Sequence, residues 1–236
     1  DLFVALTTSL KGVPENSILV ITSKAVSIGE GRCVLQSQYT RAELVPQEAE
    51  YYFPPSKVAQ GEYQAAIKHH AFIASAGIDK SNSGEYMTLL PANPTHSAHR
   101  IWMWLRKAYG VKCVGVLITD SHLMPMRRGT VGLSIGHYGF EPLTDYRGTP
   151  DLFGRPMQVT LRNIADGLAA AAVVAMGEGS EQTPVALITD LPFVRFTPKS
   201  SIKIRGESLL VEPQDDVFYP LLKRAHWKKG GGGIHL

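Results

Sequence analysis

Short apolar runs along the chain predict a set of buried strands. The run SILVIT at 17–22 is short, β-branched and flanked by Pro14 and Gly29, which is typical of a strand inside a sheet. Similar runs predict strands at 72–78, 111–119, 131–136 and 185–189. The pattern therefore predicts a sheet with buried strands, drawn from distant parts of the sequence.

Two stretches have helical spacing instead. In 97–110, Ile101, Leu105 and Ala108 recur on one face of a helix that would end at Gly110. The Ala-rich run 157–176 predicts a second helix. Because its side chains are small, this helix is expected to pack closely against a sheet or another helix.

The other segments have weaker patterns. Residues 36–70 are rich in Gln, Glu, Tyr and Pro and read as a surface excursion or a short helical insertion. One more strand is expected at 201–211 and a terminal helix at 215–227, although Pro220 disfavours that helix. Helices and strands mix without a regular βαβ order, so the expected fold class is α+β or irregular α/β, not a doubly wound sheet.

Composition narrows the class of protein. The 236 residues are 44% hydrophobic and 19% charged, enough for one domain at 1–229 followed by a flexible Gly-rich tail at 230–236. A diffuse net charge of +3 favours a local anion site and no nucleic-acid partner. The sequence has no run of about 20 apolar residues, so no membrane partner is expected. Cys33 and Cys113 are too few for a disulfide framework or a zinc motif, and reduced thiols in the cytoplasm are expected.

Acidic residues follow two of the predicted strands. Asp79 and Asp120 each stand where an apolar run ends, and Ser121 comes next to the second. Carboxylates and hydroxyls at strand ends are oxygen ligands for Mg²⁺ or Mn²⁺. Turn and cap residues give the same pattern. From the residues alone, a turn or cap role is favoured over metal binding for a single such Asp. For Asp79 the two roles are closer to equal.

Two basic segments suggest anion binding. Ser23 and Lys24 directly follow the first strand, with glycines downstream, but the spacing is not that of a P-loop. Arg127 and Arg128 lie between two predicted strands beside Gly129. Guanidinium groups bind phosphate or carboxylate well, yet from the residues alone a solvated turn with two exposed arginines is slightly favoured.

The sequence L-I-T-D occurs twice, at 117–120 and at 187–190. The second copy ends in Asp190. This residue is expected to be either a further ligand or a turn residue, and the pattern alone leaves both interpretations open.

Long ordered segments resemble the coenzyme F420-0:L-glutamate ligase family, the F420 γ-glutamyl ligases. They include A-G-I-D-K-S-N, G-V-L-I-T-D-S, R-R-G-T-V-G-L-S-I-G, D-Y-R-G-T-P-D-L-F-G-R-P-M-Q-V-T and M-G-E-G, at 76–82, 115–121, 127–136, 145–160 and 176–179. The resemblance covers about residues 15–190. It implies an unusual α/β fold that forms an intertwined homodimer.

The resemblance also implies a reaction. L-glutamate would be attached to a small-molecule carboxylate acceptor, through an acyl phosphate made from GTP or ATP with Mg²⁺ or Mn²⁺. By position, it assigns metal binding to Asp79, Asp120 and Ser121, and nucleotide binding to Ser23, Lys24 and Asn82. Arg127 and Arg128 match the family's basic loop and are assigned a catalytic role on phosphate or substrate carboxylate.

Departures from the family pattern cluster around nucleotide and acceptor. Ile28 stands where a second lysine is usual, the bulky His122-Leu123-Met124 replaces a G-R-P/C loop, and Thr189-Asp190 replaces an R-G pair. Two alternatives therefore stay open beside the F420-0 ligase. One is a glutamyl ligase for another acceptor such as a folate, and the other is a diverged nucleotide- or metal-binding protein without ligase activity.

Overall fold

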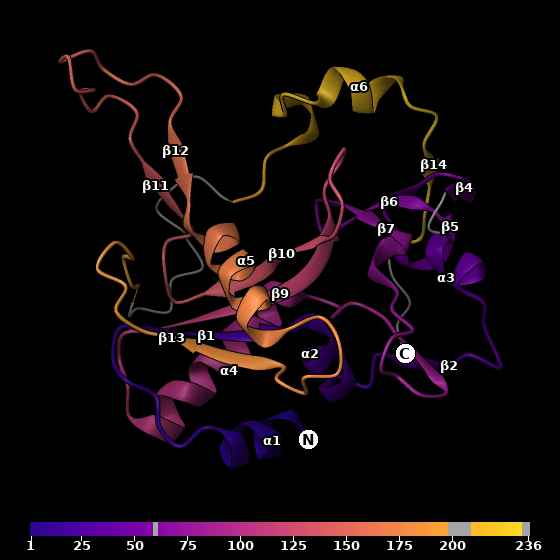
Figure 1. Ribbon diagram of the computed structural model, residues 1–236, viewed down its shortest axis with the longest axis horizontal. Helices are drawn as coiled ribbons and strands as arrows, with labels where there is room; N and C mark the ends of the chain where they lie inside the picture. Colours follow the sequence, from indigo (N-terminus) through magenta and orange to yellow (C-terminus); the bar gives the residue numbers. More distant parts are fainter. Residues whose placement is uncertain (59–60, 198–208, 233–236) are drawn as a thin grey trace.

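The computed structural model describes residues 1–58, 61–197 and 209–232. Its centre is a four-stranded sheet in the order β10-β9-β1-β13 (Figure 1). β1 (Ser17–Thr22) and β9 (Val114–Leu123) are parallel, with Thr22 opposite Thr119. β10 (Thr130–Tyr138) and β13 (Val185–Ile188) pair antiparallel with them. The sheet therefore has parallel central strands and antiparallel edges.

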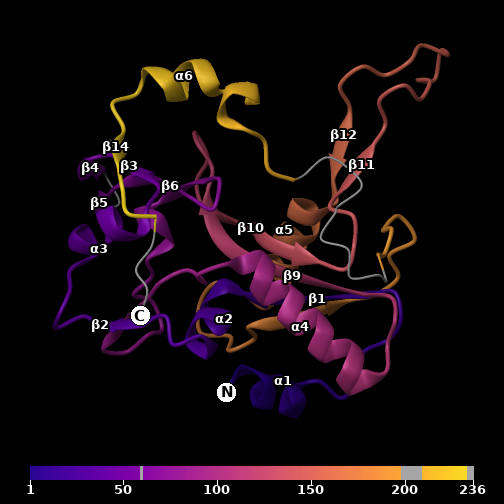
Figure 2. The same cartoon turned by 180° about the vertical axis from the view of Figure 1, so that it is seen from behind.

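Helices cover both faces of this sheet (Figures 1 and 2). α4 (Pro94–Tyr109) packs on one face with α1 (Leu2–Ser9) and α2 (Ser23–Gly29), around buried Leu19, Ile21, Ile101 and Trp102. α5 (Ile164–Met176) covers the other face. A Cβ added to Gly132 of β10 would overlap the carbonyl oxygen of Ala169 in α5. The small side chains of both elements allow this close approach, as the Ala-rich pattern predicted.

The predicted helix at 157–176 is wrong at its start. α5 begins at Ile164, because the side chain of Asn163 accepts the N–H of Asp166 (3.0 Å) and caps the helix. The preceding β12 (Leu161–Asn163) instead pairs with β11 (Leu143–Asp145) at the base of a projecting arm. The predicted helix at 97–110 is confirmed as α4, which Gly110 ends in a left-handed conformation.

Residues 36–70 are more than a surface excursion or helical insertion. They contain α3 (Arg41–Glu48), β3 (Tyr51–Tyr52), β4 (Ser56–Val58), β5 (Gly61–Tyr63) and β6 (Ala65–Lys68). With β7 (Ala71–Ala74), β2 (Cys33–Leu35) and β8 (Tyr86–Thr88), they build a small lobe with its own core. The predicted strand at 72–78 stops at Ala74, because Ser75 and Ala76 turn with positive φ.

The C-terminal segment runs from the main body across to the small lobe (Figure 1). α6 (Tyr219–Arg224) is shorter than the predicted helix at 215–227, and Pro220 lies in its first turn, where proline is tolerated. β14 (Lys228–Lys229) then pairs with β3, giving a sheet in the order β14-β3-β6-β7. Gly230, Gly231 and Gly232 donate backbone hydrogen bonds to residues 46–50. The strand expected at 201–211 lies mostly outside the described residues, as does the end of the tail.

The fold agrees with the predicted mixture of α and β elements. Among the described residues, every helix is too short or too polar to cross a bilayer.

Candidate functional site

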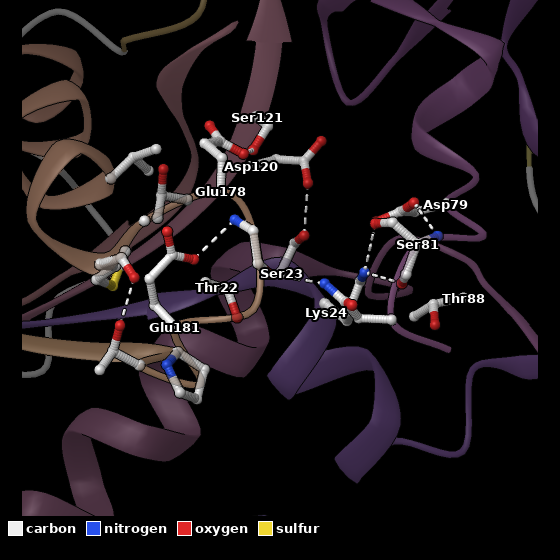
Figure 3. A pocket seen from close by; sticks show the side chains of 18 of the residues that line it. Thr22, Ser23, Lys24, Asp79, Ser81, Thr88, Asp120, Ser121, Glu178 and Glu181 are labelled. Atoms are coloured by element: carbon white, nitrogen blue, oxygen red, sulfur yellow. Dashed lines mark hydrogen bonds and ion pairs between the residues drawn. The ribbon is translucent and has the colours of Figure 1, made fainter. Parts of the chain in front are cut away.

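A pocket opens where the parallel pairing of β1 with β9 ends, at Thr22 and Thr119. Thr22 ends β1, and its hydroxyl caps α2 by accepting the N–H of Ala25 (3.3 Å). The pocket is lined from four distant segments, within 22–24, 77–90, 119–121 and 173–184, and Figure 3 shows their side chains converging. The lining includes all six residues for which the sequence predicts metal or nucleotide binding: Ser23, Lys24, Asp79, Asn82, Asp120 and Ser121.

Asp120 lies on β9 itself, not after it. The apolar run ends at Thr119, but β10 pairs with β9 as far as Leu123, so the strand continues past the acid. Ser23 Oγ donates to Asp120 Oδ1 (2.6 Å). Burial raises the pKa of Asp120 to about 6, and the nearby charges of Asp79 and Glu178 add to the rise, against the Ser23 hydrogen bond. The carboxylate thus stands in an environment short of positive charge.

Asp79 comes from the small lobe and pairs across the pocket with Lys24 of α2 (2.6 Å). The backbone N–H and hydroxyl of Ser81 also donate to this carboxylate, at 2.7 and 2.8 Å. Burial alone would raise the pKa of Asp79, but the hydrogen bonds from Lys24 and Ser81 hold it below its usual value. The ion pair therefore joins the two halves of the molecule at the site.

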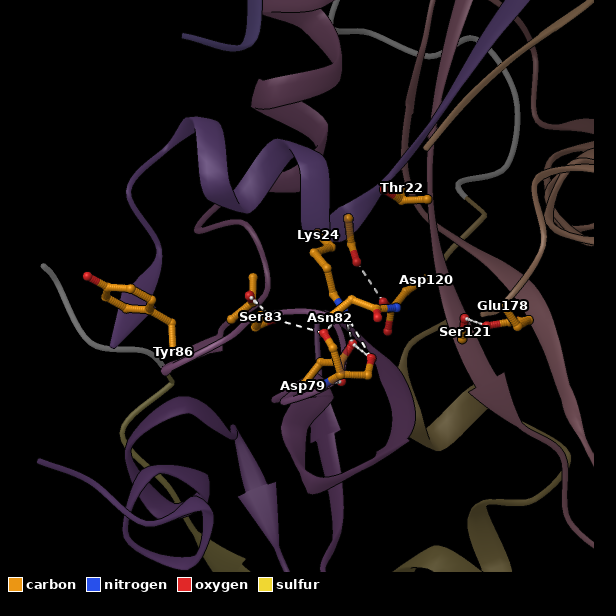
Figure 4. Close-up of polar contacts among 12 residues, drawn as sticks. Thr22, Lys24, Asp79, Asn82, Ser83, Tyr86, Asp120, Ser121 and Glu178 are labelled. Atoms are coloured by element: carbon orange, nitrogen blue, oxygen red, sulfur yellow. Dashed lines mark hydrogen bonds and ion pairs between the residues drawn. The ribbon is translucent and has the colours of Figure 1, made fainter. Parts of the chain in front are cut away.

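Asn82 closes the pocket on another side. It has positive φ, and its side-chain amide donates to the carbonyl oxygen of Gly179 (2.8 Å), in the loop after α5. Figure 4 shows Asn82 between Lys24 and Asp120, beside Asp79. Four segments that are remote in sequence are thus held together by hydrogen bonds around one space.

Glu178 is a site residue that the sequence predictions missed. Its carboxylate accepts from the hydroxyls of Ser121 (2.6 Å) and Thr130 (3.0 Å), and it lines the pocket with Glu181. Both acids follow α5, which ends at Gly177 with positive φ. The segment M-G-E-G was part of the resemblance, but a single glutamate in a Gly-rich loop has no strand before it to suggest a ligand.

Arg127 and Arg128 lie elsewhere. They occupy the exposed turn between β9 and β10, where the Arg127 N–H donates to the Met124 carbonyl (3.2 Å), and neither lines the pocket. The structure does not bring them to the six residues above. Their catalytic role stays a prediction.

The second Thr-Asp pair, Thr189-Asp190, lies at the end of the sheet away from the pocket. β13 is antiparallel to β1, with Ile188 opposite Ile18. Asp190 therefore follows the strand at the edge remote from Thr22 and Thr119. It has positive φ and does not line the pocket, as expected of a turn residue.

Ile28 does not line the pocket either. Its side chain is 56% exposed near the end of α2. The isoleucine in place of a family lysine therefore leaves the described pocket lining unchanged.

The lining is chemically suited to a hard divalent cation. Asp79, Asp120, Glu178 and Ser121 offer only oxygen donors, which Mg²⁺ and Mn²⁺ prefer. Burial, and after it the charges of Asp79 and Glu178, raise the pKa of Asp120, and a bound cation would favour its charged form. In this conformation, no three His, Cys, Asp or Glu side chains of the described residues lie close enough to form a ready-made metal cluster.

Comparison with known proteins bears on the whole chain. The family described as F420-0:Gamma-glutamyl ligase matches residues 1–190. The coenzyme F420:L-glutamate ligase of Methanococcus maripaludis is 40% identical over 151 residues, covering 64% of this chain and 58% of that protein. The Methanocaldococcus jannaschii protein of the same name is 38% identical, covering 69% and 62%. The Archaeoglobus fulgidus protein is 30% identical, covering 89% and 87%.

The chain thus spans about three fifths of the length of the first two relatives and most of the third. The matched region contains the central sheet, the small lobe apart from β14, and every described residue of the pocket. The match confirms the resemblance seen in the sequence. The chain belongs to the F420-0:gamma-glutamyl ligase family.

Proposed function

We propose that this protein is an NTP-dependent γ-glutamyl ligase that attaches L-glutamate to an F420-0-like carboxylate acceptor through an acyl phosphate. One observation carries the proposal. Six residues given roles by the resemblance, from segments 23–24, 79–82 and 120–121, meet in one pocket where the parallel pairing of β1 with β9 ends. Such a meeting favours a shared ligand over three separate caps and turns.

Lys24 is the phosphate-binding residue in this proposal. It is the only cationic side chain among the described residues that line the pocket, and it already bonds the oxygens of Asp79 and Ser81. A triphosphate of GTP or ATP would offer it stronger acceptors. Asn82 would donate to the nucleotide from its fixed position beside Gly179.

Asp79, Asp120 and Ser121 would hold Mg²⁺ or Mn²⁺, with Glu178 positioned to assist. A bound divalent cation would neutralise the phosphate oxygens of the nucleotide. Ser23 fixes the orientation of Asp120 by donating to its Oδ1. These residues would bind and orient the γ-phosphate for transfer to the acceptor carboxylate, before the amine of L-glutamate displaces it.

The experiment is a turnover assay on the purified chain. L-glutamate, Mn²⁺, GTP or ATP and either F420-0 or a folate are incubated with the protein, and nucleoside diphosphate and product mass are measured. The expected result is stoichiometric nucleoside diphosphate and an acceptor heavier by one glutamyl unit. Nucleotide binding without turnover on any acceptor would refute the ligase activity. It would favour the alternative of a nucleotide-binding protein without ligase activity.

The chain supplies a matched control. Asp120→Asn should abolish turnover, because it removes a pocket carboxylate. Asp190→Asn makes the same change in the second Thr-Asp pair, which lies at the end of the sheet away from the pocket. Asparagine tolerates the positive φ of residue 190. Equal effects of the two changes would contradict the placement of the site.

A further inference from the structure

Lys24 uses all of its hydrogen-bonding capacity within the pocket. A lysine ammonium has three N–H donors and no acceptor. Lys24 Nζ contacts Asp79 Oδ2 (2.6 Å) and donates to Ser81 Oγ (3.1 Å) and to the Ser81 carbonyl oxygen. Figure 3 shows both residues beside the ammonium. In this conformation each donor of Lys24 therefore has an acceptor, and binding a phosphate oxygen requires that one of these contacts be given up.

Asp79 is the contact that Lys24 is best placed to give up. The Ser81 backbone N–H donates to Asp79 Oδ1 (2.7 Å) and the Ser81 hydroxyl donates to Oδ2 (2.8 Å), so this carboxylate is oriented without the help of Lys24. The side chain of Asp79 is also 43% exposed. Departure of the ammonium would therefore leave a carboxylate that is already oriented and open to a ligand.

The charge of the pocket favours a divalent cation over an ammonium at this carboxylate. The described lining contains one ammonium, Lys24, and four carboxylates: Asp79, Asp120, Glu178 and Glu181. A single positive charge does not balance these groups, whereas a divalent cation brings two. A divalent cation and an ammonium bound to the same carboxylate would repel each other, because the Coulomb energy scales with the product of their charges. The two cations therefore compete for Asp79.

The exchange of one cation for the other does not require the pocket to open. The side-chain amide of Asn82 donates to the Gly179 carbonyl (2.8 Å) and joins the small lobe to the main body independently of Lys24. Lys24 lies in the first turn of α2. Its flexible stem of four carbons would leave the released ammonium within reach of the same space.

We propose that Lys24 gives up Asp79 to a divalent cation, and that the released ammonium then binds the nucleotide phosphates. Metal and nucleotide would thereby bind with positive coupling through this one side chain. The coupling is reciprocal, so a nucleotide that draws Lys24 away from Asp79 would raise the affinity for the metal by the same factor. The inference rests on the proposed ligase function, but its tests measure binding and lysine reactivity instead of turnover.

The release of Lys24 is tested on the unaltered chain by lysine acetylation, followed by mass spectrometry. The contacts with Asp79 and Ser81 shield the amine from the reagent. Mn²⁺ should therefore raise the acetylation rate of Lys24 by about threefold or more, and a non-hydrolysable GTP or ATP analogue added next should lower it again. Lys80 is exposed outside the described lining and is the internal reference, whose rate should stay constant. Unchanged acetylation of Lys24 at saturating Mn²⁺ would overturn the release.

The competition is tested by calorimetry with Mn²⁺ alone. Lys24→Met removes the ammonium and keeps the length of the side chain, so Mn²⁺ affinity should rise by about tenfold. Lys24→Arg keeps the charge and should bind Mn²⁺ like the wild type. Lys80→Met removes the same charge from the loop that carries Asp79, outside the pocket lining, and is the matched control. A Lys24→Met affinity no higher than that of wild type would overturn the competition, provided that circular dichroism shows an intact fold.

The coupling is measured in the same titrations with the nucleotide analogue. Mn²⁺ should tighten analogue binding by a larger factor in the wild type than in Lys24→Met, and equal factors would overturn the coupling. Wild-type turnover with unchanged Mn²⁺ affinity in Lys24→Met would overturn the exchange and leave the ligase. Tighter Mn²⁺ binding by Lys24→Met without wild-type turnover would support the exchange and refute the ligase activity. Absence of Mn²⁺ binding to both chains would overturn the exchange together with the metal site.

Discussion

Glu48 is the buried anion of the small lobe and lies between two buried cations. It is 0% exposed, and its Oε2 accepts from Arg32 Nη2 (2.7 Å) and Lys68 Nζ (2.9 Å). Arg32 and Lys68 are only 5% and 2% exposed. The change Glu48→Gln keeps the shape of the side chain and removes its charge, leaving two cations in the core with no opposite charge between them.

The magnitude follows from burial. Removing one partner of a buried ion pair costs about 3–5 kcal/mol, because the remaining charge stays desolvated. Other acceptors remain, since the carbonyl of Glu48 accepts from Lys68 (2.7 Å) and that of Leu90 from Arg32 (3.0 Å). We therefore expect a loss of about 3 kcal/mol, a large part of the roughly 5–15 kcal/mol that stabilises a typical protein.

The assay is unfolding in guanidinium chloride, followed by circular dichroism and tryptophan fluorescence. Trp227 reports on the small lobe, since its ring lies 4.2 Å from that of Phe53. Glu85→Gln, an exposed change in the same lobe, is the control and should change stability little. A free energy of unfolding for Glu48→Gln within about 1 kcal/mol of wild type would refute the reasoning.

Three further predictions concern packing, pH and metal. In thermal unfolding, Gly132→Ala should lower stability by about 1–3 kcal/mol, because its Cβ would overlap a backbone carbonyl of α5. Gly167→Ala is the control: its Cβ meets open space in α5, so it should raise stability by up to about 1 kcal/mol. Burial lowers the pKa of His137 to about 4. The imidazole of the unfolded chain takes up a proton below about pH 6.5, and that of the folded chain only near pH 4. As the pH is lowered from about 6.5 to about 4, stability should therefore fall by at most about 3 kcal/mol. A denaturation series in which His137→Phe keeps the same pH dependence would contradict this. Calorimetry should show Mn²⁺ binding weakened at least tenfold by Asp120→Asn but not by Asp190→Asn. Equal Mn²⁺ affinities of the two variants would contradict a metal site in this pocket.

The sequence predicted the elements whose signals are local. The buried strand β1 and the capped helix α4 lie where their patterns placed them, because apolar spacing and terminal residues decide them. The six pocket residues followed from the resemblance, while the parallel register of β1 with β9 explains why Ser23 and Asp120 meet. Glu178 could not be found this way, since its position depends on how α5 packs on the sheet.

Other features depend on partners that the local pattern does not contain. β9 extends through Asp120 because β10 pairs with it, and α5 starts late because Asn163 caps it. The two L-I-T-D runs look alike, yet β9 is parallel to β1 and β13 is antiparallel to it, so Asp120 and Asp190 lie at opposite ends of β1. The small lobe escaped prediction because its strands are short and its last strand comes from residues 228–229.

That last strand has a consequence for the order in which the molecule can be assembled. The carbonyl of Gly232 accepts from Lys68 (3.0 Å), and β14 completes a sheet whose other strands lie between residues 51 and 74. A ribosome makes those strands long before it makes residue 232. During translation, β3 therefore remains without its partner β14, and Lys68 lacks the Gly232 carbonyl as an acceptor, until residues 228–232 have been made. A chain cut at residue 190, where the family match ends, would keep the pocket residues but lose the segment that finishes this lobe.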